Sequence, residues 1–413
     1  MMKIPCSKLA PALLVLFSVS PATGQEAQQD SQEEQQQDAQ QKTQREQDAE
    51  RTAERLQALE DQFEALAGDV EGFELRDIMP PVGEGVHGLG PASSKVYHRD
   101  SGLSIGGYGE LRYKNFTKGS GTDEFDLSRA VLYFGYKFDD HWVFNSEIEF
   151  EHADETFVEF AYLDYLHRDS LNFRGGLLLS PMGLVNELHE PTTFLAANRS
   201  LTESYIIPST WRENGVGVFG ELGGFEYRAY VMTGFDGAGF GGKQGLRGGR
   251  QKGSKAKAED FALVTRFDWT DTPGLLVGGS AYFGDAGQEQ GAGDMETTIV
   301  EVHADYRSGP FWGRALLADA SVDDRDAGDM DLDGWYLEAG WDLLAQNDRQ
   351  SLYPFFRFEN IDTDESAGGI DDTALTIGLH YQPHPQIVFK LDHTDYDDDA
   401  DDDVTTFLIG YVF

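Results

Sequence analysis

Seven basic side chains lie near the middle of chain segments in which polar and apolar residues alternate. An extended strand would place each of them on its polar face, because successive side chains of a strand point to opposite sides. Arginine suits an oxyanion such as phosphate, since its planar fork donates two parallel hydrogen bonds. These candidates for anion binding are Arg129, Arg174, Arg228, Arg266, Arg314, Arg357 and Lys390, and Arg199 and Arg212 from a long connection could join them.

Acidic residues share the same polar faces, so two interpretations are open. Basic and acidic walls could oppose one another across an interior space, orient dipolar solutes and admit ions of either sign. Alternatively, opposite charges on neighbouring strands could pair and satisfy one another. The acids with this placement are Glu110, Glu147, Glu149, Glu226, Asp268, Glu301, Glu338, Asp342, Glu359 and Asp392.

No arrangement typical of catalysis stands out. The chain has no Gly-x-Ser-x-Gly elbow, no His-Glu-x-x-His pair and no glycine loop that would cradle phosphates. Asp329, Asp331 and Asp333, followed by Gly334, imitate the first half of a calcium loop, but Gly340 stands where a bidentate Glu is required. We therefore predict no enzymatic activity, no cofactor and no metal centre.

The elements that position these side chains are strands. From Leu103 onward the pattern has a period of two, which predicts about sixteen of them. Every second connection is short, as are the periplasmic turns of a membrane barrel, and the longest connection runs from Pro181 to Trp211. One strand is ambiguous, because Glu159 shares parity with Ala161 and Leu163. The strands are predicted to begin near Leu103, Glu124, His141, Thr156, Leu171, Arg212, Gly224, Glu259, Gly274, Asp294, Pro310, Leu332, Gln350, Ile370, Pro385 and Asp403.

The last strand, Asp403 to Phe413, stops on an aromatic residue and in this resembles the last strand of bacterial outer-membrane β-barrels. The apolar faces of other strands carry aromatic residues near the strand ends, which favours a membrane girdle over the core of a soluble sandwich. The formal net charge of -41 is compatible with a wet interior and wet loops. The predicted fold class is all-β, a transmembrane antiparallel β-barrel of about sixteen strands over residues 101–413, preceded by a short coiled-coil helix.

Three of the four segments before the barrel are defined by composition. Residues 1–24 have the positive, apolar and small-residue regions of a secretory signal peptide, whose removal would also remove Cys6; a short buried helix is the alternative. Residues 25–50 are rich in Gln and Glu and are predicted to be disordered, because they bury too little apolar surface. Residues 76–100 are predicted to be a Gly- and Pro-containing linker, too short for a folded plug.

The remaining segment, residues 51–75, carries a heptad pattern. Three heptads are few, so the helix would gain stability from association with other copies. A coiled coil and a single amphipathic helix lying against the barrel or membrane are both compatible with the pattern. Its apolar positions are Leu56, Leu59, Phe63, Leu66 and Val70.

The connection from Gly237 to Ala258 carries six basic residues and no acid. We expect it to lie outside the barrel. There it could steer anions toward the mouth, contact lipopolysaccharide phosphates, or remain a solvated flexible loop. The six residues are Lys243, Arg247, Arg250, Lys252, Lys255 and Lys257.

Several short motifs between Phe125 and Glu221 resemble those of the phosphate-selective porin O and P family. They are Ser128-Arg129-Ala130, Phe173-Arg174-Gly175-Gly176 leading to Pro181-Met182-Gly183-Leu184, Asn198-Arg199-Ser200-Leu201, and Arg212-Glu213-Asn214-Gly215-Val216-Gly217. The resemblance implies a homotrimer of sixteen-stranded channels whose pores are lined by Arg and Lys. Porins resemble one another in folding their third long loop, here residues 181–211, into the lumen as a constriction.

With this resemblance, the predicted function is passive diffusion of small hydrophilic solutes through a bacterial outer-membrane porin, with a weak preference for anions such as phosphate. The N-terminal segment would lie in the periplasm, and Phe413 would be contacted by the barrel assembly machinery. Outer-membrane lipid and lipopolysaccharide are the other expected partners, and nucleic acid is not. The alternative is a structural protein that tethers the outer membrane to the cell wall through its coiled coil.

Overall fold

The computed structural model describes residues 39, 42–63, 82–118, 121–289, 294–324, 328–347, 349–364, 369–397 and 403–413. The chain divides into two units, Met1–Glu74 and Leu75–Phe413. The predicted signal peptide, residues 1–24, lies outside the described residues, as do residues 64–75 of the heptad segment.

The first unit contains a helix over residues 42–63. Residues 42–50 are therefore helical, and their assignment to a disordered segment was wrong. Gln, Glu, Lys and Arg are good helix formers, so high polarity does not prevent a helix there. The apolar stripe is solvent-exposed: Leu56, Leu59 and Phe63 keep 55%, 61% and 73% of their surface accessible. No helix in the described parts of the chain combines the length and apolar character needed to cross a membrane.

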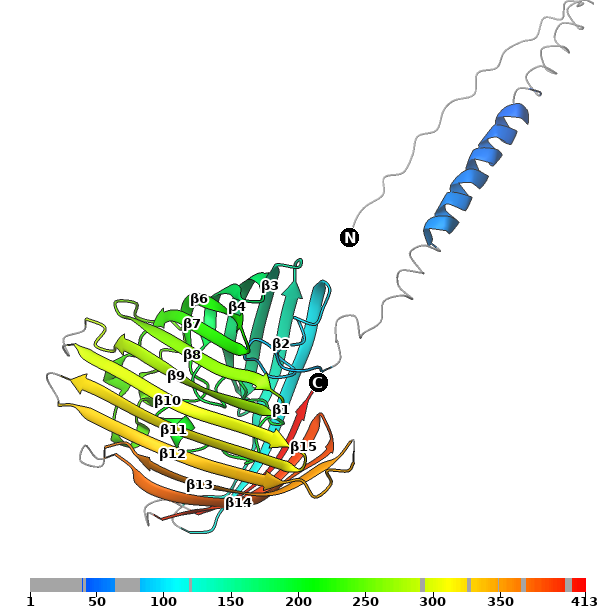
Figure 1. Cartoon of the computed structure of the whole chain (residues 1–413). Coiled ribbons are helices and arrows are strands. Elements are labelled where there is room, and N and C mark those ends of the chain that lie inside the picture. Colours follow the sequence, from blue (N-terminus) through cyan, green and yellow to red (C-terminus); the bar gives the residue numbers. More distant parts are fainter. Residues whose placement is uncertain are drawn as a thin grey trace, which may run out of the picture. The chain divides into compact units, whose positions relative to one another are not determined.

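The second unit is a closed antiparallel barrel in which each strand pairs with its sequence neighbours and β1 pairs with β16 (Figure 1). The predicted strand number is confirmed in the described residues, and each predicted start lies within two residues of the observed one. The strands are β1 (Gly102–Phe116), β2 (Glu124–Lys137), β3 (Trp142–Glu151), β4 (Glu155–Arg168), β5 (Leu171–Leu179), β6 (Arg212–Leu222), β7 (Phe225–Thr233), β8 (Phe261–Thr272), β9 (Leu275–Asp285), β10 (Met295–Ser308), β11 (Phe311–Asp324), β12 (Met330–Trp341), β13 (Ser351–Asp362), β14 (Asp371–His384), β15 (Ile387–Tyr396) and β16 (Val404–Val412).

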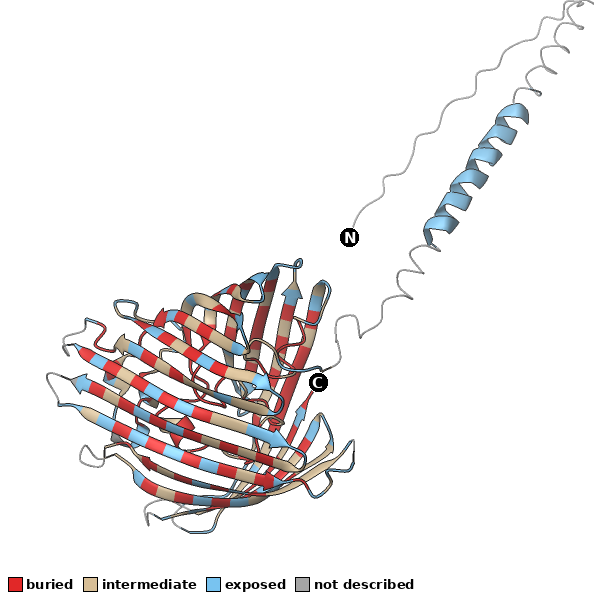
Figure 2. Ribbon diagram, in the orientation of Figure 1, coloured by how far each residue is buried: buried red, intermediate tan, exposed pale blue. Residues whose placement is uncertain are grey.

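Inside and outside alternate along the strands, as Figure 2 shows by the alternation of buried and exposed residues. On β12, Leu337 is 47% exposed on the outer face, whereas the neighbouring Glu338 is 3% exposed and points inward. This is the reverse of a soluble protein, in which the apolar face would be the buried one. The alternation fits an outer surface in contact with lipid and a polar interior.

Strand β4 contains a bulge that resolves its ambiguous parity. Opposite β3 the register shifts, so that Glu147 pairs with Phe160 and Ile148 pairs with Val158. Glu159 is the extra residue, and both it and Phe160 are buried. A bulge places two residues opposite one. The alternation therefore changes phase at Glu159, and Leu163 faces outward as an apolar residue should.

The connection between β5 and β6, residues 180–211, runs inside the barrel and includes the short helix α2 (Thr202–Tyr205). It contacts several walls: Gly183 donates to Glu301 on β10, and Ala197 donates to Asp392 on β15. Its last residue, Trp211, is 2% exposed and stacks on Phe235 with 4.5 Å between ring centroids. We call residues 180–211 the inner loop.

The segment before β1 also enters the lumen, so its assignment to a simple linker was wrong. Leu89, Ala92, Ser94 and Lys95 are each less than 5% exposed. Tyr97 donates to Asp164 on β4. Sequence composition indicated only a flexible connection, because Gly and Pro are as common in tightly packed turns as in linkers. Residues 86–99 are called the lumen segment below.

Candidate functional site in the barrel lumen

Two cavities lie within the lumen, on either side of the inner loop. The turn-side cavity, about 600 Å³, is lined by residues near the short turns, such as Thr272 and Pro385. The loop-side cavity, about 550 Å³, is lined by residues near the long connections, such as Lys114 and Tyr396. No residue lines both cavities, but each cavity is lined in part by residues of the inner loop. The inner loop therefore separates two vestibules, as a constriction does.

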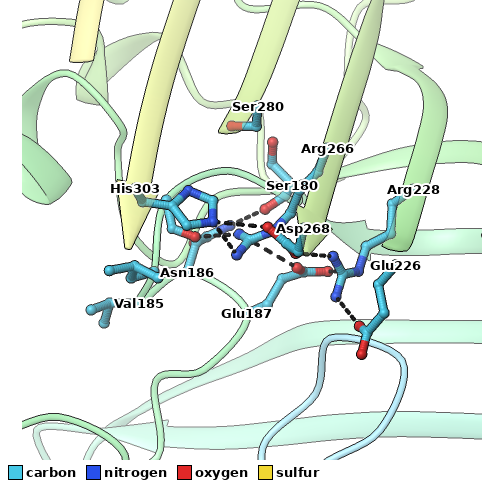
Figure 3. A network of polar contacts seen from close by, with 12 residues as sticks. Ser180, Val185, Asn186, Glu187, Glu226, Arg228, Arg266, Asp268, Ser280 and His303 are labelled. Atoms are coloured by element: carbon cyan, nitrogen blue, oxygen red, sulfur yellow. Dashed lines mark hydrogen bonds and ion pairs between the residues drawn. The ribbon is translucent and has the colours of Figure 1, made fainter. Parts of the chain in front are cut away.

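A polar network fixes the inner loop to the wall of the turn-side cavity (Figure 3). Arg266 donates to Asp268 at 2.7 Å and to the carbonyl of Gly183. Arg228 donates to Asp268 at 3.1 Å and lies 3.5 Å from Glu187 of the inner loop. Burial raises the pKa of Glu187, and the guanidinium groups of Arg228 and Arg266 oppose that shift. The two arginines thus balance two buried carboxylates.

His303 on β10 completes this network from the other side. Its Nε2 lies 2.8 Å from Asp268 and its Nδ1 lies 2.8 Å from Glu301. Glu301 also accepts from the hydroxyl of Ser280 at 2.6 Å. A histidine between two carboxylates could suggest a metal centre, but the described residues contain no group of three or more His, Cys, Asp or Glu able to hold a metal ion. The neighbouring Arg266 supplies the positive charge instead.

Three further predicted cations hold the inner loop by its backbone. Arg314 donates to the carbonyl of Thr193 at 2.5 Å and pairs with Asp305 at 2.6 Å. Lys390 donates to the carbonyls of Phe194 and Ala196 at 2.9 and 3.0 Å. Arg357 reaches the carbonyl of Asn198 at 2.9 Å and Glu359 at 3.0 Å. Cations that the sequence suggested for solute binding thus position the constriction.

Arg174 and Arg212 are also engaged by protein partners. Arg174 binds both carboxylate oxygens of Asp164, at 2.8 and 2.9 Å, and donates to the hydroxyl of Tyr97. Arg212 lies 2.7 Å from Glu159. Like Lys390 and Arg357, these two arginines line neither vestibule. For these residues the structure favours ion pairing or loop anchoring over solute binding.

The loop-side cavity brings together the remaining predicted residues, Arg129 and Arg199. Arg129 lies 3.4 Å from Glu149, a long ion pair. No hydrogen bond or ion pair joins the Arg199 guanidinium to another residue in the described parts of the chain. Burial, followed by repulsion from Arg129, lowers the pKa of Arg199. The cavity is lined by five cations and two carboxylates: Arg112, Lys114, Arg129, Arg199, Arg247, Glu110 and Glu151.

The basic connection between β7 and β8 folds inward in part, which corrects the expectation that it lies outside. Arg247 donates to the carbonyls of Ser204 and Ser209, and Arg250 donates to that of Ser209 at 2.7 Å. Lys243, Lys252 and Lys255 are exposed. The two arginines of this connection bind the inner loop and these three lysines do not, because a guanidinium can donate to several carbonyls at once.

Sequence reasoning missed Arg247 as a lining residue, together with the partners of the lumen segment. Arg247 carried a signal, since it belongs to the basic cluster, but its loop was assigned to the exterior. Lys114, at the end of β1, also lines the cavity and was not among the predicted site residues. Glu190 and Ser93 had no sequence signal, because their roles depend on a contact between residues far apart in the chain.

The closed barrel with its inward-folded loop defines the class of protein: the fold is that of bacterial outer-membrane porins. Salmonella typhi OmpF in complex with daunomycin aligns with a TM-score of 0.53 at 15% identity, covering 76% of this chain and 98% of that one. The anion-selective porin from Comamonas acidovorans gives 0.51 at 13% identity, covering 76% and 100%. The trimer form of in-vitro folded OmpT from Vibrio cholerae gives 0.51 at 13% identity, covering 76% and 99%. At these identities the likeness establishes the fold.

A relative in sequence defines the family. An uncharacterized protein of Aquifex aeolicus (strain VF5) is 36% identical over 376 residues, which is 82% of this chain and 86% of that protein. The chain therefore belongs to the same family as that protein. No protein-family model matches the chain, and the resemblance to the phosphate-selective porin O and P family stays a prediction.

Proposed function

We propose that the chain is a porin of the bacterial outer membrane and that small hydrophilic solutes cross it by passive diffusion. The observation that carries the proposal is a closed barrel, apolar outside, whose two vestibules meet at the inner loop. The proposal assigns the chain a transport role and no enzymatic activity. Purified protein in a planar bilayer should give stepwise conductance, and bilayers that stay closed at every voltage would refute it.

A weak anion preference follows from the loop-side cavity. Its lining has five cations and two carboxylates, which leaves an excess of three positive charges. These charges act on a solute at close range, because screening at physiological salt acts over about 8 Å. Arg199, whose guanidinium makes no hydrogen bond or ion pair in the described chain, is the residue most available to an oxyanion. Phosphate is the proposed solute because an arginine fork matches its geometry.

The reversal potential in a potassium chloride gradient tests this preference. Arg199→Ala and Arg247→Ala should each shift it toward cation selectivity. Lys255→Ala is the matched control, since it removes the same charge from an exposed position that does not line the cavity. A cation-selective wild type would refute the preference and leave the porin assignment intact. Block of chloride current by phosphate, relieved by Arg199→Ala, would support phosphate as the solute.

The same proposal includes a homotrimer, with the N-terminal segment in the periplasm and with lipopolysaccharide and the barrel assembly machinery as partners. Support for the trimer comes from the exposed stripe of Leu56, Leu59 and Phe63, which needs other copies to become buried. The trimer form among the structural neighbours is consistent with it. Native mass spectrometry in detergent should show three copies; monomer alone would contradict the proposal.

A tether between outer membrane and cell wall is the second candidate function. The observation in its favour is the exposed helix at residues 42–63, which belongs to a unit of its own. A tether predicts cell-wall pull-down that requires residues 25–75, together with silent bilayers. A porin predicts conductance that survives removal of those residues.

A further inference from the structure

We propose that the lumen segment, residues 86–99, is a second constriction element that narrows the turn-side half of the pore and limits the size of solutes that pass. The inference rests on the proposed porin function. It adds to the inner loop a second segment, built from the chain before the first strand.

The lumen segment has a folded form of its own. Its backbone makes consecutive turns, in which Leu89 donates to Val86 at 3.0 Å, Ser94 donates to Gly90 at 3.0 Å, and Tyr97 donates to Ser94 at 2.9 Å. Turns of this kind satisfy backbone groups locally, which lets a short segment lie inside a lumen without strand partners. The shape of the segment is therefore supported by hydrogen bonds within it as well as by its contacts with the wall.

One carboxylate of the inner loop accepts hydrogen bonds from three donors of this segment. The amides of Ala92 and Ser93 each donate to Glu190 at 3.0 Å, and the Ser93 hydroxyl donates to it at 3.2 Å. Glu190 is 1% exposed. The contact joins two chain segments that both occupy the lumen, so the lumen segment and the inner loop form one obstruction.

The wall of the barrel holds the far end of the segment. The Tyr97 hydroxyl donates to Asp164 at 2.6 Å and accepts from Arg174 at 3.1 Å. Asn145 on β3 donates to the carbonyl of Ser93 at 2.9 Å. The predicted pore cation Arg174 therefore serves to position the segment. The segment is held by these hydrogen bonds together with the packing of the buried Leu89, Ala92 and Val96.

Two glycines allow the close approach. A Cβ at Gly90 would lie 2.4 Å from a carboxylate oxygen of Glu190. Gly88 has φ of +81°, and a Cβ there would lie 2.5 Å from the guanidinium of Arg228. Gly88, Leu89 and Pro91 all line the turn-side cavity. The absence of a side chain at these two glycines thus lets the segment lie directly against Glu190 and Arg228.

The test combines release and locking of the segment. Glu190→Ala removes the acceptor for three donors, and Tyr97→Phe removes the bond to Asp164. Hydrogen bonds to charged groups have strengths that correspond to a shift of roughly ten- to a hundredfold in the docking equilibrium per substitution. Glu190→Gln is the matched control, because glutamine has a side chain of the same length and keeps one acceptor oxygen.

Locking uses the paired substitutions Val96→Cys and Gly135→Cys. A Cβ at Gly135 would lie 2.5 Å from the Cβ of Val96, so a shift of about 1 Å reaches the spacing of a disulfide. The only other cysteine, Cys6, lies in the predicted signal peptide. Introduced into the Glu190→Ala variant, this pair should give low conductance when oxidised and higher conductance when reduced. Heat-modifiable mobility on gels confirms that each variant is folded.

Conductance and liposome swelling with uncharged sugars of increasing size are the readouts. Glu190→Ala and Tyr97→Phe should admit larger sugars than the wild type, and Glu190→Gln should lie between. Equal conductance and equal size limits in the oxidised, reduced and wild-type proteins would overturn this inference while the porin function stands. Absence of current and swelling in every folded variant would overturn the porin function, and the second constriction with it.

Discussion

Arg266 is expected to be the most important single anchor of the inner loop. The change Arg266→Met keeps the aliphatic bulk and removes the charge. Arg266 is 3% exposed and has four polar partners: Asp268, the carbonyl of Gly183, His303 at 3.0 Å, and Glu187 at 4.0 Å. The substitution leaves a buried carboxylate and a buried carbonyl without this donor.

The size of the effect follows from what remains around Asp268. Breaking a buried ion pair by removing one partner destabilises a protein by about 3–5 kcal/mol. Asp268 keeps Arg228 at 3.1 Å and His303 at 2.8 Å, so it is not left alone. We therefore expect the lower end of the range, about 3 kcal/mol. The control Lys257→Met breaks an ion pair of 2.7 Å with Asp236 at the surface and should change stability by less than about 1 kcal/mol.

Urea titration of the folded barrel in detergent, followed by tryptophan fluorescence, measures both changes. The double variant Arg266→Met/Asp268→Asn should recover part of the loss, because it removes both charges. If Arg266→Met lowers the free energy of unfolding by no more than Lys257→Met does, the view that this network holds the inner loop is refuted. Strict additivity of the two network substitutions would also refute it, since residues in one ion-pair network should be coupled.

Three further predictions concern other parts of the chain. Deletion of Glu159 should still allow barrel assembly, because it removes the extra residue and leaves Val158 outward and Phe160 inward in regular alternation, whereas deletion of Ala161 should prevent assembly, because it moves the outward residues on one side of it to the inner face; heat-modifiable gel mobility will show both. Leu56→Asp with Leu59→Asp should abolish self-association of an isolated 42–75 peptide in analytical ultracentrifugation; unchanged association would rule out the heptad contact. Phe413→Ala should reduce the amount of folded barrel in outer-membrane fractions more than Tyr411→Ala does, if the terminal aromatic is the assembly signal, and equal amounts would count against that role.

The barrel itself was predictable from the sequence. A strand has a period of two, and lipid on one side and water on the other force opposite residue types onto its two faces, so alternation reports both strand and orientation. This is why strand starts near Leu103, Glu124 and Leu171 could be located within two residues. The bulge at Glu159 left a visible break in parity, but only the register opposite β3 shows which residue is the extra one.

The contents of the lumen depended on the tertiary structure. The sequence showed that cations such as Arg266 and Lys390 face inward. It did not show whether each of them binds a solute or another part of the protein. Their partners are carbonyls and carboxylates of the inner loop and the lumen segment, which lie far from these cations in sequence. Alternation says which way a side chain points, whereas the group it meets there depends on how irregular segments fold. The sequence therefore determined the wall of the barrel, and the packing of two non-repetitive segments inside it decided which charges line the remaining space.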